Sequence, residues 1–323
     1  MGGDHAPGAV VAGAADAVRE SGGRLTVALV GQQERIEREL KALGIPGSGM
    51  TVVHAAEVIE MHDAPTAALK AKKGSSISIG LGMHREGRAQ GFVSAGNTGA
   101  VLSASTLILG RLEGVGRPTI GALVPTAGSP AFLVDAGANV DCRPRHLFEF
   151  GVMGSIYVTT MLAIPSPRVG LLSIGEEETK GNEVTLEAHA LLKSSTLNFI
   201  GNVEGRDILK GTADVVVCDG FVGNIVLKFG ESVPAFLKAR FTSYAAGNLS
   251  RKVVGLIARS GLRTVMKELD YQEYGGVPVL GVRGVSIIGH GGSSPKAIKN
   301  MILRAEEMIH RQVNGKIQEA LKA

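Results

Sequence analysis

The segment VSIIGHGGSSP, residues 285–295, joins a short apolar run to a glycine-rich turn and then to a proline. The apolar run Val285–Ile288 predicts a strand, and Pro295 is favoured as the first residue of a helix. An apolar stripe at helical spacing follows, formed by Ile298, Met301, Ile302, Ala305, Ile309, Val313, Ile317 and Leu321. The segment therefore predicts a strand, a tight turn and a helix in succession.

The same order recurs along the chain. The turn SAGNTG at 94–99 follows a predicted strand at 91–94, and GEEETKGN at 175–182 follows one at 169–174. Further strands are expected at Leu25–Val30, Thr51–His54, Ile120–Val124, Ala131–Asp135, Asn198–Gly201, Asp214–Cys218 and Val279–Val282. Helices are expected at Gln32–Leu43, Pro65–Lys73, Thr98–Leu109, Pro144–Leu162 and Asn182–Lys193. This alternation predicts one α/β domain over 1–323, a Rossmann-like αβα sandwich with a mostly parallel sheet. Ligands are expected at the carboxyl ends of the strands, where the turns fall.

A segment of helical pattern with little strand character, about 222–274, interrupts this rhythm. It predicts a helical excursion that protrudes from the α/β body. Its middle combines cations with exposed-looking aliphatic side chains: Arg251, Lys252, Leu256, Ile257, Arg259 and Arg263. Such a basic amphipathic tip suits an anionic membrane surface or an acidic protein. A dimer interface with solvated basic edges explains the pattern equally well.

Composition excludes several classes of function. The net charge of +4 is mild, and aromatic residues make up only 4% with no Trp, which argues against a nucleic-acid-binding protein. Two cysteines without a CxxC pair indicate a reducing cytosol, and no 18-residue apolar run predicts a membrane span. The motifs GxGxxG, GxxxxGK[ST], GxSxG and HExxH are absent, and the eight histidines lack metal spacing. We therefore expect neither a cofactor nor a metal.

Five glycine-rich turns carry the candidate site, since GGDHAP at 2–7 and DGFVGN at 219–224 join the three above. A turn that opens a helix presents backbone N–H groups and the positive end of the helix dipole, which favours a bound phosphate. The predicted phosphate- or substrate-binding residues are Asp4, Ser94, Asn97, Thr98, Gly99, Asp219, Asn224 and Ser293. Asn97 and Ser293 could equally be ordinary helix caps.

The predicted catalytic residues are Lys180, Asn182, His290 and His5. Lys180 could orient phosphate or stabilise a thioester oxyanion, and a histidine at a strand end could be a general acid or base. The competing interpretations are a solvated lysine and structural histidines. Cys142 and Cys218 could be nucleophiles, but both are better explained as small core residues.

At these residues the chain resembles the PlsX family, the bacterial phosphate acyltransferases of phospholipid synthesis. The matching stretches are MGGDHAP (1–7), SAGNTGA (94–100), DAGANVDCRP (135–144), IGEEETKGNE (174–183), FIGNVEGRDI (199–208), ADVVVCDGFVGNIVLK (213–228), GVPVLGV and IIGHGGSS. The resemblance implies a fold similar to phosphotransacetylases and to isocitrate or isopropylmalate dehydrogenases. It implies that inorganic phosphate attacks the thioester of acyl-acyl carrier protein, so that no enzyme nucleophile is needed.

The resemblance also implies partners and a location. Acyl phosphate would feed a membrane glycerol-3-phosphate acyltransferase, and the protein would be a cytoplasmic homodimer held peripherally at the inner face of the cell membrane. Family members usually have a short strand, with a pattern like IAVDA, before MGGDHAP. Here Met1 begins at the motif, so the first strand is expected to be missing from this chain, which affects the placement of Asp4 and His5.

Three other functions compete with this one. An acyltransferase could use a short acyl group on coenzyme A, a dehydrogenase of similar fold would bind a nicotinamide, and a membrane-surface scaffold would act through 251–263 alone. Phosphate-dependent turnover, nicotinamide binding and liposome binding separate them.

Overall fold

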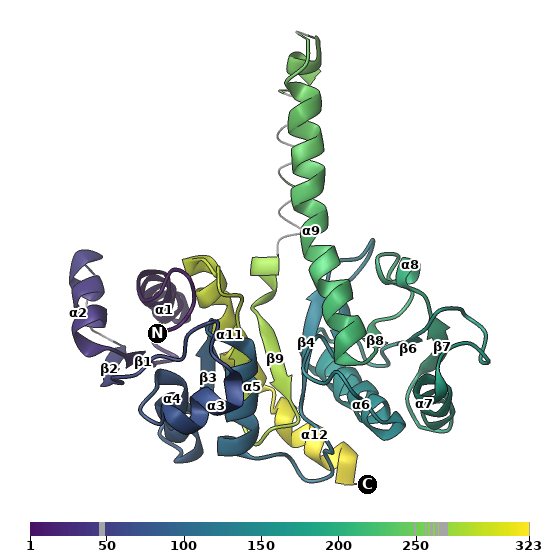
Figure 1. The fold of residues 1–323 in the computed structure, drawn as a ribbon, viewed down its shortest axis with the longest axis horizontal. Coiled ribbons are helices and arrows are strands. Elements are labelled where there is room, and N and C mark those ends of the chain that lie inside the picture. The colour runs from purple at the N-terminus through teal and green to yellow at the C-terminus, as the bar shows by residue number, and fades with distance from the viewer. Residues whose placement is uncertain are drawn as a thin grey trace.

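The computed structural model describes residues 1–44, 49–248, 250–254, 256, 258, 261, 264 and 271–322. Its centre is an eight-stranded mixed sheet with helices on both faces (Figure 1). In spatial order the strands are β3 (Gly91–Ser94), β10 (Val285–Ile288), β9 (Val277–Leu280), β4 (Thr119–Val124), β5 (Ala131–Val134), β8 (Val215–Val217), β6 (Val169–Leu172) and β7 (Phe199–Val203). A separate two-stranded parallel sheet contains β1 (Val27–Gly31) and β2 (Met50–His54). The predicted αβα sandwich is therefore confirmed.

Alternate side chains of the central strands enter different layers. Phe132 and Val134 of β5 pack against one helix layer, while Leu133 between them packs into the opposite one. The first layer contains α6 (Pro144–Met161), α7 (Glu183–Lys193), α11 (Pro295–His310) and α12 (Val313–Lys322). The opposite layer contains α3 (Pro65–Ala71), α4 (Ser76–Arg85), α5 (Thr98–Ala104) with its π-helical extension Ser105–Leu109, α8 (Gly205–Ile208) and the base of α9 (Gly220–Ala245).

The amino-terminal part of the chain forms a small lobe of its own. Helices α1 (Gly8–Ser21) and α2 (Gln33–Ala42) pack with β1 and β2 around Val11, Ala14, Leu29 and Ile36. Helix α1 also lies directly on α11, because Gly13 allows a close approach. A Cβ at Gly13 would lie only 2.4 Å from the carbonyl oxygen of Pro295.

The two halves of the large sheet run in opposite directions, a feature that the strand pattern did not predict. β3 and β10 are parallel to one another, and β5, β8, β6 and β7 are parallel to one another. Between them, β9 and β4 pair antiparallel with their neighbours on both sides. The carboxyl ends of the two halves therefore point toward opposite edges of the sheet.

The register nevertheless brings those ends to nearly the same level. Ile120 of β4 and Ser286 of β10 both lie beside Val279, and the next residue of β4, Gly121, lies beside Val134, the last of β5. Because β4 and β10 run the same way, Val134 is level with Ile287, one residue before β10 ends. The carboxyl ends of β5 and β10 therefore lie at nearly the same level in the middle of the sheet. They are about 14 Å apart, across three strand spacings.

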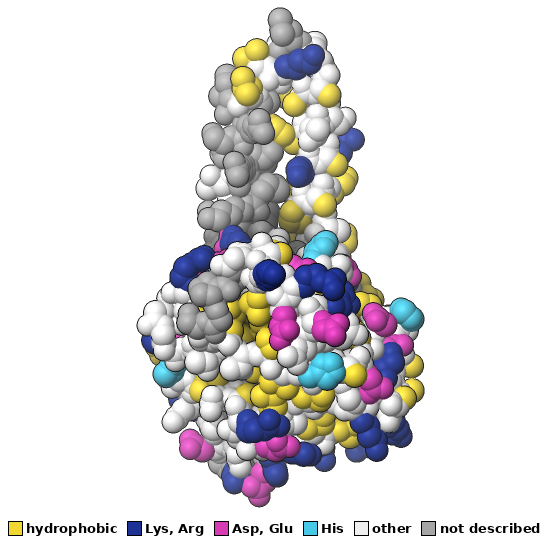
Figure 2. Space-filling model, turned by 90° about the vertical axis from the view of Figure 1, so that its left-hand side faces the viewer, with side chains coloured by type: hydrophobic (Ala, Val, Ile, Leu, Met, Phe, Trp, Pro, Cys, Tyr) yellow, Lys and Arg dark blue, Asp and Glu magenta, His cyan; other side chains and the backbone are white. Residues whose placement is uncertain are grey.

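Helix α9 projects far beyond the sheet (Figure 1). Its 26 residues correspond to about 39 Å of helix, and the exposed side chains along it include Phe229, Phe236 and Leu237. Beyond its end, Arg251, Lys252 and Leu256 are exposed, with Leu256 70% accessible. Figure 2 shows basic and apolar side chains mixed along this arm. Ile257, Arg259 and Arg263 lie outside the described residues.

Candidate functional site

Three of the five predicted glycine turns are hydrogen-bonded to one another at the carboxyl ends of β3 and β10. The N–H of Gly289 donates to the carbonyl of Ser94 at 2.8 Å, and the N–H of Asp4 donates to the carbonyl of Gly291 at 2.8 Å. A Cβ at Gly291 would lie 3.3 Å from a carboxylate oxygen of Asp4, so the Asp4 side chain lies against this glycine. The turns at 2–7, 94–99 and 289–294 thus form one unit.

The polar side chains of this unit brace its backbone. Ser94 Oγ accepts from the N–H of Gly96 at 3.1 Å, and Ser293 Oγ donates to the carbonyl of His290 at 2.6 Å. The Nδ1 atom of His290 accepts from the N–H of Gly292 at 3.1 Å, so a neutral His290 carries its proton on Nε2. His290 and His5 are both exposed, which leaves their rings accessible to a substrate.

Asn97 acts as a tether and a helix cap. Its side-chain amide lies 3.1–3.2 Å from the carbonyl oxygens of Glu60, Met61 and Asp63, while its Oδ1 accepts from the N–H of Ala100 at 3.0 Å. The side chain is 7% exposed and engaged at both ends. This geometry favours the capping interpretation and leaves the first-turn N–H groups at Thr98 and Gly99 as the anion donors of α5.

The other two predicted turns follow the carboxyl ends of β8 and β6. Asp219 Oδ1 caps α9 by accepting from the N–H of Val222 at 2.8 Å. Near the start of the same helix, Asn224 packs on Gly137. A Cβ added at Gly137 would lie 3.3 Å from the Cβ of Asn224. The turn 175–182 begins on the next strand, since Leu171 of β6 lies beside Val217 of β8. The turns at 175–182 and 219–224 therefore begin on adjacent strands.

Asp135 organises the loop beneath α9, and sequence reasoning assigned it no role. This fully buried carboxylate accepts from the N–H groups of Gly137, Ala138 and Asn139 at 2.7–2.9 Å and from the Asn139 amide at 2.8 Å. Burial raises the pKa of the carboxyl, and the four donors oppose that shift. Its motif DAGAN was the only signal that could have identified it.

Both cysteines lie against this loop as neutral thiols. Burial, with Asp135 and Asp219 nearby, raises the pKa of Cys142 to about 12 and raises that of Cys218 well above its usual value. Cys218 Sγ lies 3.5 Å from the carbonyl oxygen of Asp135. A thiol with so high a pKa is a poor nucleophile at neutral pH, which favours the core interpretation.

Lys180 and Asn182 lie exposed in the turn between β6 and α7. Asn182 caps α7 by accepting from the N–H of Thr185 at 2.9 Å. The backbone of Lys180 is fixed on both sides, because Ser173 Oγ donates to its carbonyl at 3.2 Å and its N–H donates to the carbonyl of Glu177 at 3.0 Å. The exposed ammonium of Lys180 is thus carried on a fixed backbone.

The floor between the two groups of turns is one apolar cluster. Ala100 of α5, Ile120 of β4, Ala136 beneath α9 and Ile288 of β10 all belong to it, with Leu227 of α9 packed against it. Helices α5 and α9 thus begin on the same face of the sheet, on either side of a switch in strand direction. Such a switch point is where α/β sheets hold ligands, and a site here has anion donors on both sides.

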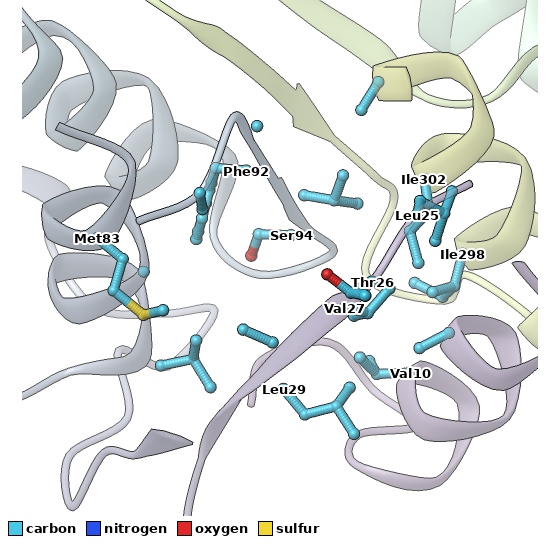
Figure 3. A pocket seen from close by; sticks show the side chains of 18 of the residues that line it. Val10, Leu25, Thr26, Val27, Leu29, Met83, Phe92, Ser94, Ile298 and Ile302 are labelled. Atoms are coloured by element: carbon cyan, nitrogen blue, oxygen red, sulfur yellow. The ribbon is translucent and has the colours of Figure 1, made fainter. Parts of the chain in front are cut away.

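A groove of about 520 Å³ lies apart from this floor, between β1 and β3 (Figure 3). Its lining is mostly apolar and includes Val10, Leu29, Met83, Phe92, Ile298 and Ile302. Met1 is at its end, where the terminal ammonium donates to the carbonyl of Val30 at 3.3 Å. Burial lowers the pKa of this ammonium to about 6, with a smaller contribution from Arg35.

The acidic side chains of Glu176, Glu204 and Asp207 gather near the 175–182 turn, with ligand atoms within 4.8 Å of one another. Each already has a basic neighbour: Arg206 contacts Glu176 and Glu204, and Lys210 contacts Asp207. These ion pairs explain why the three acidic side chains lie together.

Comparison with solved structures identifies the class of fold. A phosphotransacetylase from Streptococcus pyogenes superposes with a TM-score of 0.63 at 17% identity, covering 94% of this chain and 92% of that one. A branched-chain phosphotransacylase from Enterococcus faecalis superposes with a TM-score of 0.59 at 14% identity, covering 96% and 97%. The chain therefore has the α/β fold found in phosphotransacylases.

Comparison of sequences identifies the family. The chain belongs to the fatty acid synthesis protein family, whose pattern matches residues 1–316. It is 49% identical over 320 residues to a phosphate acyltransferase from Heliobacterium modesticaldum, covering 99% of this chain and 95% of the relative. It is 48% identical over 331 residues to one from Chlorobaculum parvum, covering 99% and 97%. The resemblance seen in the sequence motifs is confirmed.

Proposed function

We propose that this protein is a phosphate acyltransferase that transfers a fatty acyl group from acyl-acyl carrier protein to inorganic phosphate. The product, acyl phosphate, would supply phospholipid synthesis through phosphatidic acid. The observation that carries the proposal is the joining of three glycine turns beside the mid-sheet switch in strand direction, with the N-termini of α5 and α9 on the two sides of that switch. The acyl transfer to phosphate named for its relatives supports the same reaction.

The chemistry requires positioning rather than an enzyme nucleophile. A phosphate oxygen attacks the thioester carbonyl carbon, the tetrahedral oxyanion collapses, and the carbon–sulfur bond breaks to release the carrier thiolate. Backbone N–H groups at Thr98 and Gly99 hold the phosphate dianion, and Lys180 or Asn182 meets the developing oxyanion. His290 or His5 transfers the proton that the thiolate finally takes.

The decisive experiment mixes the purified chain with phosphate and a long-chain acyl carrier protein and measures acyl phosphate by hydroxylamine trapping. We expect turnover that saturates with phosphate and is far slower with acetyl-coenzyme A. Lys180→Ala should lower kcat/KM for phosphate about 10²-fold, the loss typical of one oxyanion donor. Faster turnover of acetyl-coenzyme A would support the rival donor, and unchanged turnover in Lys180→Ala would remove Lys180 from the mechanism.

The arm supports two further proposals, which are compatible. The exposed apolar side chains of α9 suit a homodimer interface, and the basic, apolar tip around Arg251 and Leu256 suits an anionic membrane or the acidic carrier protein. Among the described residues no helix is long and apolar enough to cross a bilayer. Peripheral contact at the cytoplasmic face would place acyl phosphate beside a membrane glycerol-3-phosphate acyltransferase.

Liposomes and sedimentation distinguish these roles of the arm. Leu256→Glu should abolish co-sedimentation with anionic vesicles while leaving the sedimentation coefficient unchanged. A change of oligomeric state without loss of vesicle binding would reassign the tip to the dimer interface.

A further inference from the structure

Two buried polar side chains lie beneath the turn that carries Lys180. His189 on α7 is 6% exposed and Asn202 on β7 is 7% exposed, although both elements otherwise enter an apolar core. Buried polar groups are normally retained only where they satisfy a specific partner. Here the partners belong to the turn 175–182.

The hydrogen bonds form a chain from the core to Lys180. Asn202 Nδ2 donates to the carbonyl of Glu177 at 2.8 Å, and the N–H of Lys180 donates to the same carbonyl at 3.0 Å. Because the Asn202 amide nitrogen is the donor, its Oδ1 is the acceptor that faces His189 Nδ1 at 3.0 Å. Nδ1 of His189 therefore carries the proton in this network.

The second ring nitrogen of His189 also faces the turn. Its Nε2 lies 3.9 Å from a carboxylate oxygen of Glu178, which Lys193 contacts at 2.6 Å. The ring is held edge-on against Phe199, with centroids 5.0 Å apart. Two consecutive residues of the turn, Glu177 and Glu178, are thus contacted by one rigid pair.

We propose that His189 and Asn202 are positioning residues for acyl transfer to phosphate, because they fix the backbone from which Lys180 reaches the reacting atoms. The inference rests on the proposed function. The carbonyl of Glu177 accepts from both Asn202 Nδ2 and the N–H of Lys180, so loss of the Asn202 donor releases the Lys180 backbone from the core. A displacement of about 1 Å in a positioning group can cost about 10²-fold in rate.

Three substitutions at two positions separate the links of this hydrogen-bond network. Asn202→Asp keeps the volume and the acceptor for His189, but replaces the donor to Glu177 with a carboxylate oxygen that repels the carbonyl. His189→Asn keeps a donor near the Nδ1 position, whereas His189→Leu removes it. The matched control is Asn314→Asp, because Asn314 Nδ2 likewise donates to loop carbonyls, those of Val282 and Gly284, at 2.8 and 2.6 Å.

The expected result is a change confined to kcat, because the proposed contact of Lys180 is with the oxyanion, which forms only in the transition state. Asn202→Asp and His189→Leu should lower kcat at least tenfold with little change in KM for phosphate or for the acyl donor. His189→Asn should recover most of the loss, and Asn314→Asp should resemble the wild type. If Asn202→Asp also resembles Asn314→Asp, or if KM rises while kcat is unchanged, the positioning role is wrong.

Hydrogen exchange provides a readout that does not need the reaction. Amides of 175–182 should exchange at least tenfold faster in Asn202→Asp and at the wild-type rate in Asn314→Asp. Absence of turnover in the wild type would reject the proposed function, while the exchange result would still decide the tether. Should Asn202→Asp fail to fold, comparison of His189→Leu with His189→Asn decides it instead.

Discussion

Gly223, in the first turn of α9, shows how closely the helix is packed on the loop of Asp135. A Cβ at Gly223 would lie 1.8 Å from the backbone oxygen of Asp135 and 2.9 Å from Cys218 Sγ. Since Cβ atoms do not approach such atoms closer than 3.0 Å, Gly223→Ala must displace α9 or the loop by at least 1.2 Å, the difference between 3.0 and 1.8 Å. The contact is with backbone, which cannot rotate away.

The expected cost follows from two opposing effects. Overpacking a well-packed site by one methyl group costs about 1–3 kcal/mol. Replacing a helical glycine with alanine returns about 0.5–1 kcal/mol. Because the clash involves backbone, we expect the upper part of the first range and a net loss of about 2 kcal/mol. The matched control is Gly230→Ala in the same helix, where an added Cβ meets nothing within 4 Å. It should gain about 0.5–1 kcal/mol from helix propensity alone.

Urea unfolding of the two variants measures this difference as a shift in midpoint at constant slope. We also expect kcat/KM for phosphate to fall at least tenfold in Gly223→Ala, because Asp219 and Asn224 move with the helix. If Gly223→Ala matches Gly230→Ala in stability and turnover, α9 does not brace the loop and the switch-point site is wrong.

Three other outcomes are expected. Asn97→Ala should destabilise the protein by about 2–4 kcal/mol in urea unfolding, from a lost cap plus the lost hydrogen bonds to three loop carbonyls. Ser75→Ala, which removes the cap of α4 and a hydrogen bond to Ser78 Oγ, should cost about 1 kcal/mol. Cys142, with a pKa of about 12, should be alkylated about 10³-fold more slowly in the native protein than in the unfolded one at pH 8. The variant Cys142→Ser should retain turnover. Rapid labelling of the native protein with loss of activity would contradict the inert role of this thiol. Urea unfolding should show about 1.9 kcal/mol less stability at pH 6 than at pH 8 from the buried Met1 ammonium, because its pKa of about 6 lies below the 8.0 of a free ammonium and protonation therefore favours the unfolded chain. Equal stability at the two pH values would refute this expectation.

The sequence predicted the strands well because each is a short apolar run ended by glycine or a polar turn. It missed α1, whose buried face is made of small residues such as Gly13, Ala14 and Ala17 and therefore lacks an apolar stripe. These small residues permit the close packing of α1 on α11. A pattern built on large side chains cannot detect such a helix.

The candidate site was predicted as a set of turns, and the structure distributes them in a way that local pattern could not specify. Alternation of side chains tells which face of a sheet a residue occupies, but the direction of a strand depends on how distant segments connect. The contacts of Asn97 with 60–63 and of Asn202 with Glu177 join residues at least 25 positions apart. His189 was missed for the same reason, since Asn202 and Glu178 become its neighbours only in the folded chain. Asp135 was missed although its hydrogen-bond partners at 137–139 lie close to it in sequence.

In the proposed reaction, the reversal of strand direction would let both groups of turns contribute donors. In a fully parallel sheet all carboxyl ends lie along one edge, so donors for the phosphate and for the thioester oxygen would approach from the same side. Here β5 and β10 end at the same level but point opposite ways, with about 14 Å between them. Helix N-termini at α5 and α9 can therefore bracket a substrate that lies across β9 and β4. Phosphate held at one side meets the acyl carbonyl held from the other, an arrangement suited to joining two bound substrates.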